Sequence, residues 1–282
     1  MPFLHRSQPG KRLPLLLLPQ VLITLLFFSG CAIKPWNRPL TESEFNTLKP
    51  FAETMRDLQA QCSPCLDGNV TISIDTQLGG RKLSGYMIIA PPDKLKFVAH
   101  NPLGQPIIAV SGDKSSFQYL DTMKRVVLTG QPLLLCRELG LPEVFASKSW
   151  GVWLSGFFPA RDKLAGMKED KEGKGVWLKF AEDTSGLQEH ILIQHEIHRV
   201  ISRIITRKDK IVLRLDYHYQ DMKDKTKLCS LPEEITVSGF DYATEVSMEF
   251  SDVAEVELWS PADFDLPQPV GYTTRHFGDE NH

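Results

Sequence analysis

The sequence lacks the features that define several classes of protein. Its 282 residues include 32 basic and 35 acidic ones, so it does not show the basic surplus expected of a nucleic-acid-binding protein. Five cysteines are too few for a small domain held together mainly by disulfides. The uncharged apolar run 13–28 is shorter than the roughly 20 residues of a membrane-spanning helix. A chain of one or two domains with a real core remains.

Catalytic signatures are also lacking. The sequence has no nucleophile elbow, no phosphate-binding loop and no clear pair of carboxylates. Residues 194–198 (QHEIH) look like a zinc site, but only three positions separate His195 from His198, whereas the metalloprotease motif needs four. We therefore expect no catalytic residue, no metal ligand and no cofactor, and a protein that is not an enzyme.

The first thirty residues have the pattern of a secretory signal. Arg6, Lys11 and Arg12 precede the apolar run 13–28, and small residues follow it. Residues 28–31 (FSGC) resemble the bacterial lipobox, with Phe28 in place of the usual leucine. That resemblance implies a signal peptide over 1–30 and lipidation of Cys31. The alternative is a membrane anchor with an incidental cysteine.

The resemblance to a lipoprotein signal also implies a location. Ala32 stands where Gram-negative lipoproteins retained at the inner membrane carry aspartate, which favours the periplasmic face of the outer membrane. Cleavage before Cys31 removes three basic residues and no acidic one, which takes the net charge from −3 to −6. Net charge therefore predicts no attraction to anionic lipid, and membrane contact is expected from acyl chains and apolar side chains.

The mature chain begins with a short tether, 31–40, and a helix. Thr41 and Glu44 fit a capping box, and apolar residues then recur at helical spacing up to residue 58, with Pro50 kinking or restarting the helix. After Cys65 the apolar period changes to two. The expected strands are 70–74, 82–90, 94–100, 106–111, 115–121, 124–129, 175–181, 187–195, 198–206, 210–219, 234–239, 244–250 and 253–259. Lys208-Asp209 is expected to turn one hairpin, and 168–174 to be a solvated loop.

This order of elements predicts a mainly β fold with few helices. The strands follow one another with only a helical insert, 133–139 and 148–154, so we do not expect a parallel doubly wound sheet. We expect about ten to twelve strands in a single curved antiparallel sheet that encloses an apolar space. That space is either filled by side chains or holds an apolar ligand.

Two segments then carry a recognisable pattern. One is the turn 101–106 (NPLGQP), and the other is 140–142 (GLP) leading into 150–159 (WGVWLSGFFP). Together they resemble the LolB family of outer-membrane lipoproteins, which receive other lipoproteins from the periplasmic carrier LolA. The likeness covers about residues 80–160 and is weaker over 230–268.

The LolB resemblance implies a fold and a function. It implies a half-barrel of about eleven strands over 41–268, with a helical lid above an apolar cavity and a tail over 269–282. It also implies acyl chains of lipoproteins as ligand, a LolA-type carrier as partner and a monomeric acceptor that inserts its cargo into the outer membrane.

The same resemblance assigns residues. Pro102, Leu103 and Gly104 occupy the membrane-insertion loop, where an isolated leucine at a turn tip recovers burial energy by entering lipid. The alternative is that Leu103 folds back into the core. Trp150, Trp153 and Phe157 occupy the lid, where they either cover an apolar cavity or are ordinary core.

Four cysteines besides Cys31 are disulfide candidates: Cys62, Cys65, Cys136 and Cys229. They allow three connectivities, and in an oxidising periplasm structural disulfides are the expected state. Free thiols and a redox-active CxxC at Cys62 and Cys65 are the alternatives. Three other functions stay open: a lipid-binding envelope lipoprotein with a different cargo, an enzyme that uses these two cysteines, and a structural lipoprotein with a filled barrel.

Overall fold

The computed structural model describes residues 34–59, 61–62, 65–76, 79–147, 149–159, 163–194, 196, 198–220, 229, 231–239, 245–256 and 258–277. The expected signal peptide, 1–30, and the expected lipidation site Cys31 lie outside these residues. The chain divides into the units Met1–Lys34 and Pro35–His282, and every described helix and strand belongs to the second. Among the described residues, no helix has the length and apolar character required to cross a membrane.

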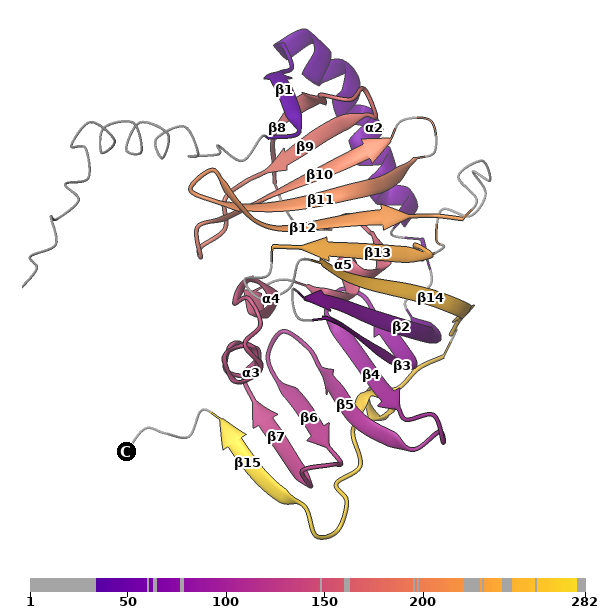
Figure 1. Cartoon of the computed structure of the whole chain (residues 1–282). Helices are drawn as coiled ribbons and strands as arrows, with labels where there is room; N and C mark the ends of the chain where they lie inside the picture. The colour runs from indigo at the N-terminus through magenta and orange to yellow at the C-terminus, as the bar shows by residue number, and fades with distance from the viewer. Residues whose placement is uncertain are drawn as a thin grey trace, which may run out of the picture. The chain divides into compact units, whose positions relative to one another are not determined.

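The second unit is built on one large sheet (Figure 1). Over the described ranges it contains fifteen strands in the order β1-β8-β9-β10-β11-β12-β13-β14-β2-β3-β4-β5-β6-β7-β15. Neighbouring strands are antiparallel except β7 and β15, which are parallel. The strands are β1 (Trp36–Pro39), β2 (Leu66–Thr76), β3 (Gly79–Ala90), β4 (Lys94–His100), β5 (Pro106–Gly112), β6 (Phe117–Asp121), β7 (Val126–Gly130), β8 (Leu164–Asp170), β9 (Val176–Phe180), β10 (Leu187–Gln194), β11 (Arg199–Arg207), β12 (Lys210–His218), β13 (Glu234–Ser238), β14 (Glu245–Glu255) and β15 (Thr273–Phe277).

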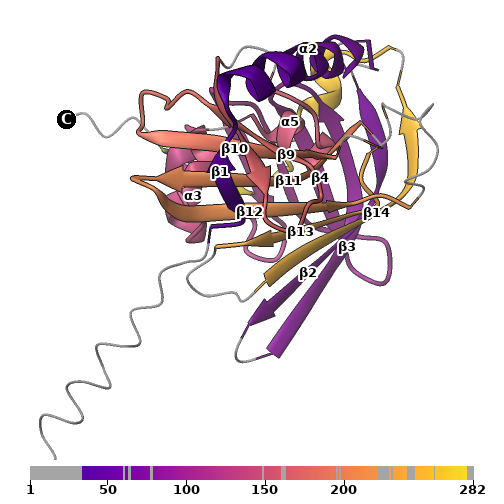
Figure 2. The same ribbon diagram turned by 90° about the horizontal axis from the view of Figure 1, so that it is seen from above.

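Helices pack against one face of this sheet. They are α2 (Glu42–Gln59), α3 (Pro132–Leu139), α4 (Val144–Ser147) and α5 (Trp150–Ser155). Figure 2 shows the sheet curving around α5, with α2 lying across the opposite side of α5. We call the sheet face that carries α2 and α5 the concave face. Its main apolar core joins side chains of α2, α4 and α5 to inward-facing residues of β2–β4 and β8–β14.

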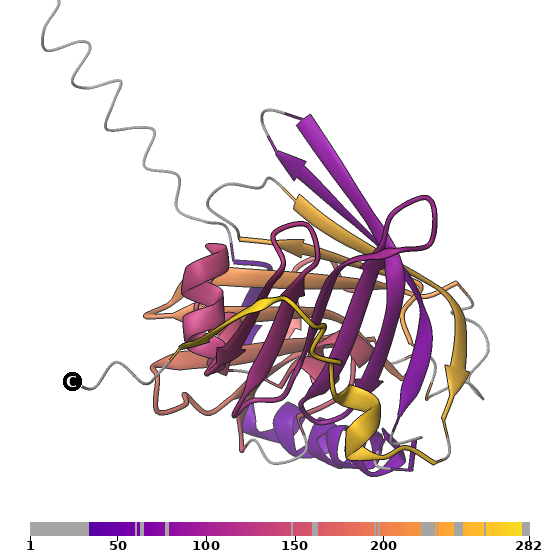
Figure 3. The ribbon, with the colours of Figure 1, turned by 90° about the horizontal axis from the view of Figure 1, so that it is seen from below.

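The C-terminal segment covers part of the other face, here called the convex face. A short 3-10 helix, Pro261–Phe264, begins this segment, and Figure 3 shows it in yellow crossing the strands toward β15. Lys96 Nζ donates to the main-chain oxygens of Asp263 and Asp265, at 2.8 and 3.0 Å. Leu266 and Tyr272 pack on a small apolar cluster around Val98. The segment expected to be a tail, 269–282, therefore contains an edge strand of the sheet.

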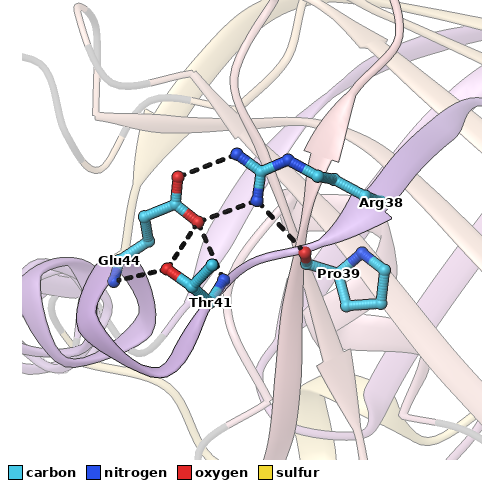
Figure 4. A network of polar contacts seen from close by, with 4 residues as sticks. All are labelled: Arg38, Pro39, Thr41 and Glu44. Atoms are coloured by element: carbon cyan, nitrogen blue, oxygen red, sulfur yellow. Dashed lines mark hydrogen bonds and ion pairs between the residues drawn. The ribbon is translucent and has the colours of Figure 1, made fainter.

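The start of α2 is fixed by polar contacts that the sequence predicted (Figure 4). The main-chain N–H of Thr41 donates to the Glu44 carboxylate at 2.8 Å, and the N–H of Glu44 donates to the Thr41 hydroxyl at 3.4 Å, which is a capping box. Both guanidinium Nη atoms of Arg38 donate to the same carboxylate at 2.8 Å. Pro50 lies within α2, so the helix neither ends nor restarts there.

The strand number is a correction to the prediction. The sheet has fifteen strands across the described residues, not about eleven, and β1 and β15 leave it open at both edges. β1 is missed because it is four residues long with only Trp36 buried. β15 is missed because its residues are mostly exposed, so they show no apolar alternation. β8 was partly assigned to a solvated loop.

The predicted strand 253–259 is wrong for a different reason. β14 runs from Glu245 to Glu255 without a break between two strands. Its pairing with β2 shifts register between Ser251 and Ala254, where Asp252 has a positive φ of 53°. A β-bulge of this kind resets the inward-outward alternation, which is why the sequence reads as two strands. The hairpin at Lys208-Asp209 is confirmed, since both residues have the positive φ of a tight turn.

Candidate functional site

The turn between β4 and β5 is held rigidly by Asn101. The Asn101 side-chain oxygen accepts hydrogen bonds from the main-chain N–H groups of Leu103 and Gln105, both at 3.0 Å. The Asn101 N–H donates to the carbonyl of Gln105 at 2.9 Å, and Gly104 has a φ of +77°, which favours glycine. This is an asparagine-organised turn whose backbone conformation is fixed by its own sequence.

The rigid turn holds Leu103 away from the protein. The Leu103 side chain is 83% exposed, and Pro102 and Gly104 beside it are also exposed. Leu103 therefore does not fold back into the core, and the side chain is free to contact something outside the chain. An apolar side chain of this size gains about 1.5–3 kcal/mol when it leaves water.

A shallow groove lies beside this turn on the convex face. It has a volume of about 600 Å³ and is lined by residues of β2, β3 and β4 and by the turn itself. Thr71 and Ser84 share a hydrogen bond across it at 3.2 Å, and Tyr86 stacks on His100 with ring centroids 5.8 Å apart. Its lining mixes polar side chains such as Thr71 and Ser84 with the apolar surface of Val70 and Pro102.

The expected lid residues lie on α5 and the segment after it. Trp153 and Phe157 are buried, and Trp150 is half-buried. Trp150 stacks on Phe145 of α4 with centroids 4.8 Å apart, and Trp153 meets the same ring edge-on at 5.9 Å. These aromatic side chains are part of the core that fills the concave side.

Close main-chain contact holds α5 against the sheet. The Val152 N–H donates to the Pro92 carbonyl at 3.1 Å, and a Cβ on Gly151 would lie 2.9 Å from the Pro91 Cα. Only a glycine allows the helix to approach the β3–β4 turn this closely. At the other end, the Phe158 N–H donates to the side-chain oxygen of Gln59 at 2.7 Å, which joins the segment after α5 to α2.

A charged pair is buried beneath the segment that follows α5. Arg203 of β11 is fully buried and donates hydrogen bonds to Glu189 of β10, to the Tyr217 hydroxyl at 3.1 Å and to the main-chain oxygen of Phe157. Burial raises the pKa of Tyr217 to about 12, so this hydroxyl stays protonated. Sequence reasoning missed this network, because a charged residue in a strand is ordinarily assigned to the solvent face.

A pocket opens between α2 and strands β8 and β9. Its volume is about 270 Å³, and its apolar wall is made by Ala52, Phe158, Leu164, Leu178 and Phe180. Three basic side chains and one acidic side chain also line it: Lys49, Arg56, Lys163 and Glu53. Small-molecule sites usually measure about 300–1,000 Å³, so this pocket is just below that range and is too small for several acyl chains.

The four cysteines in the described part of the chain comprise one disulfide and two buried thiols. Cys62, which follows α2, is bonded to Cys229, and the sequence separation is 167. Cys65 and Cys136 are buried in different apolar clusters. Burial raises the pKa of Cys136 to about 11 and also raises the pKa of Cys65, so neither thiol is activated as a nucleophile.

The histidine motif lies only partly within the described residues. The His198 ring packs 5.3 Å from the ring of Phe51 on α2, and His195 lies outside the described residues. Within the described part of the chain, no group of three or more His, Cys, Asp or Glu side chains is placed to bind a metal ion.

Comparison with known proteins supports the fold alone. No protein-family model matches the sequence, and no match is found among curated proteins. The structure is similar to a DUF1329 family protein from Desulfovibrio piger, with a TM-score of 0.51, 10% identity and coverage of 76% of this chain and 96% of that one. A LolA superfamily protein from Nitrosomonas europaea has a TM-score of 0.49 and 9% identity, with coverage of 76% and 97%.

Proposed function

We propose that this protein is an outer-membrane lipoprotein that accepts lipid-anchored cargo from a LolA-type periplasmic carrier and delivers it to the membrane. The observation that carries the proposal is Leu103, held 83% exposed at the tip of a turn that its own side chains make rigid. At the tip of this turn Leu103 contributes little to folding, and insertion into lipid would recover its burial energy. The lipobox at Cys31 and the LolB-like segments support the same assignment.

Delivery of this kind requires no bond to be made or broken. Acyl chains pass from one apolar site to another and then into the bilayer, and each step is driven by burial of methylene groups. In this structure the lid aromatics occupy the concave side, so cargo binding requires α5 to move away from the sheet. The contacts that resist this movement are the Val152–Pro92 and Phe157–Arg203 hydrogen bonds.

A transfer assay tests the proposal. The chain from Ala32 onward includes all of Pro35–His282, the unit that contains every described element. It is mixed with a LolA-type carrier loaded with a lipoprotein, and transfer of the cargo is measured, first to the chain and then to liposomes. We expect Leu103→Glu to accept cargo normally and to fail in release to liposomes, because a charge at the tip opposes insertion into lipid.

Leu258→Glu is the matched control. Leu258 is 92% exposed. Two positions earlier, the Val256 N–H donates to the carbonyl of Cys65, just before β2. This end of β2 and β3 is remote from the β4–β5 turn that carries Leu103. This variant should release cargo like the unmodified chain. Absence of transfer to a folded chain would exclude the acceptor function, and normal release by Leu103→Glu would exclude the role of the turn.

The pocket beside α2 favours a second candidate, a carrier of single-chain anionic lipids. Its apolar wall and its excess of basic over acidic lining residues suit a fatty-acid carboxylate better than the uncharged acyl groups of a lipoprotein. Extraction and mass analysis of lipids that co-purify with the folded chain distinguishes the two. A stoichiometric fatty acid would favour this second function.

A further inference from the structure

We propose that three neighbouring turns form one surface that docks on an anionic phospholipid bilayer. The turns are 101–105, 122–125 and 266–272, and we call them together the turn surface. The proposal deepens the proposed function by naming the lipid surface, and it rests on that function only in sharing Leu103. Figure 1 shows all three turns at the lower end of the sheet.

Hydrogen bonds place the three turns side by side. Residues 101–105 lead directly into β5, and the hydroxyl of Thr122 donates to the carbonyls of Pro106 and Ile107, both at 3.0 Å. On the other side, the Thr273 N–H donates to the Arg125 carbonyl at 2.9 Å, which joins the third turn to the second. The order along the sheet is therefore β4–β5 turn, β6–β7 turn and the segment before β15.

Each turn presents an apolar side chain to solvent. Leu103 and Met123 are each 83% exposed, and Val270 is fully exposed. These three are half of the large apolar side chains that are exposed in the described part of the chain. Scattered exposed apolar residues are ordinary, but three on adjacent turns at one end of a sheet form a surface.

The turn surface presents two exposed cations, one of which is paired with a flanking aspartate. Its sixteen residues include Lys124 and Arg125, both exposed, and no acidic residue. Asp121 and Asp265 flank the surface. Asp121 is largely buried and pairs with Lys124 at 3.5 Å, while the Lys124 side chain is 78% exposed. The net charge of the chain therefore does not describe this end, which carries cations beside an apolar tip, the combination that binds anionic bilayers.

The turns are also preorganised, so docking orders little chain. Asn101 fixes the first turn, and the Lys124 N–H donates to the Asp121 carboxylate at 2.9 Å in the second. In the third, Gly271 has a φ of +83° and Tyr272 is anchored in the cluster around Val98. The conformational cost of binding is therefore small.

Vesicle binding by the chain from Ala32 onward tests the turn surface. The probes are vesicles of phosphatidylcholine alone and of phosphatidylcholine mixed with phosphatidylglycerol. We expect preference for the anionic vesicles, and Met123→Ser and Val270→Ser should each weaken binding by about tenfold. The double variant Lys124→Gln/Arg125→Gln should remove the preference for anionic lipid while leaving weak binding to the neutral vesicles.

Leu258→Ser is the control for loss of an exposed apolar side chain, and it should bind like the unmodified chain. Unchanged binding by Met123→Ser/Val270→Ser, or an equal loss in Leu258→Ser, would overturn the turn surface. The transfer assay separates this result from the proposed function. Intact vesicle binding without cargo transfer from the carrier would remove the acceptor function and leave the turn surface standing.

Discussion

The centre of the concave face and the turn surface break the usual rule of burial in opposite directions. At the centre, the ions Arg203 and Glu189 are enclosed among apolar side chains. At the turn surface, Leu103, Met123 and Val270 face water beside two cations. Neither arrangement is what folding stability alone selects, since buried ions cost desolvation energy and exposed apolar groups forgo burial.

The two regions differ in where the interaction partners of these side chains lie. The partners of Arg203 are within the chain: a carboxylate, a hydroxyl and the carbonyl of Phe157 at the end of the lid. The ion pair therefore fixes where the lid segment meets the sheet. The exposed apolar side chains Leu103, Met123 and Val270 face solvent instead, and the partner that we propose for them is a bilayer.

The largest effect is expected from breaking the buried pair. Arg203→Leu leaves Glu189 buried without its cation and the Phe157 carbonyl without its donor. We expect a loss of about 3–5 kcal/mol in the free energy of unfolding, measured by urea denaturation.

An exposed pair is the matched control. Arg214 and Asp216 lie on the neighbouring strand β12 with nitrogen and oxygen 2.7 Å apart, and both side chains are partly exposed. Arg214→Leu should cost only about 0–1 kcal/mol. Equal losses in the two variants would show that burial does not distinguish the pairs.

A smaller effect is expected at the start of α2, where the ion pair is exposed. The Arg38 guanidinium, followed by the N–H and hydroxyl of Thr41, holds the pKa of Glu44 well below its ordinary value of 4.5. A lowered pKa contributes stability that is present above the ordinary pKa and is lost as pH falls toward the folded-state pKa.

Glu44→Gln tests this contribution by its pH dependence. The variant should be slightly less stable than the unmodified chain at neutral pH, with a difference well below that of Arg203→Leu. The difference should shrink as pH falls below about 4.5, because the unmodified chain then loses the same interactions. A difference in thermal midpoint that grows in acid would contradict the assignment.

The sequence predicted the structural features that depend on residues a few positions apart. The capping box at Thr41, the hairpin at Lys208-Asp209 and the helix ends at Gly140 and Gly156 each depend on residues within a few positions. The strands β4 and β5 were placed within a residue because apolar residues alternate along them. The turn that presents Leu103 was also identified from its four-residue sequence.

The same reasoning could not predict strand pairs and disulfides between residues far apart in the sequence. β15 pairs with β7 across more than half of the chain, and its exposed residues show no period. The partner of Cys62 is 167 positions away, and spacing alone left three connectivities open. Met123 and Val270 were not singled out, because each is an ordinary turn residue until the sheet brings their turns beside Leu103.

The smallest effect on stability is expected at the turn surface itself. This result distinguishes side chains that stabilise the fold from side chains that contact an external surface. Leu103→Ser removes an apolar side chain that has little buried contact, so the free energy of unfolding should change by no more than about 0.5 kcal/mol. Urea denaturation of this variant and of Met123→Ser measures it. If either substitution cost as much as a core truncation, about 2–5 kcal/mol, the side chain would serve the fold rather than an external surface. An unchanged stability together with lost delivery would mean that folding tolerates these residues and that their selective value lies in contact with lipid.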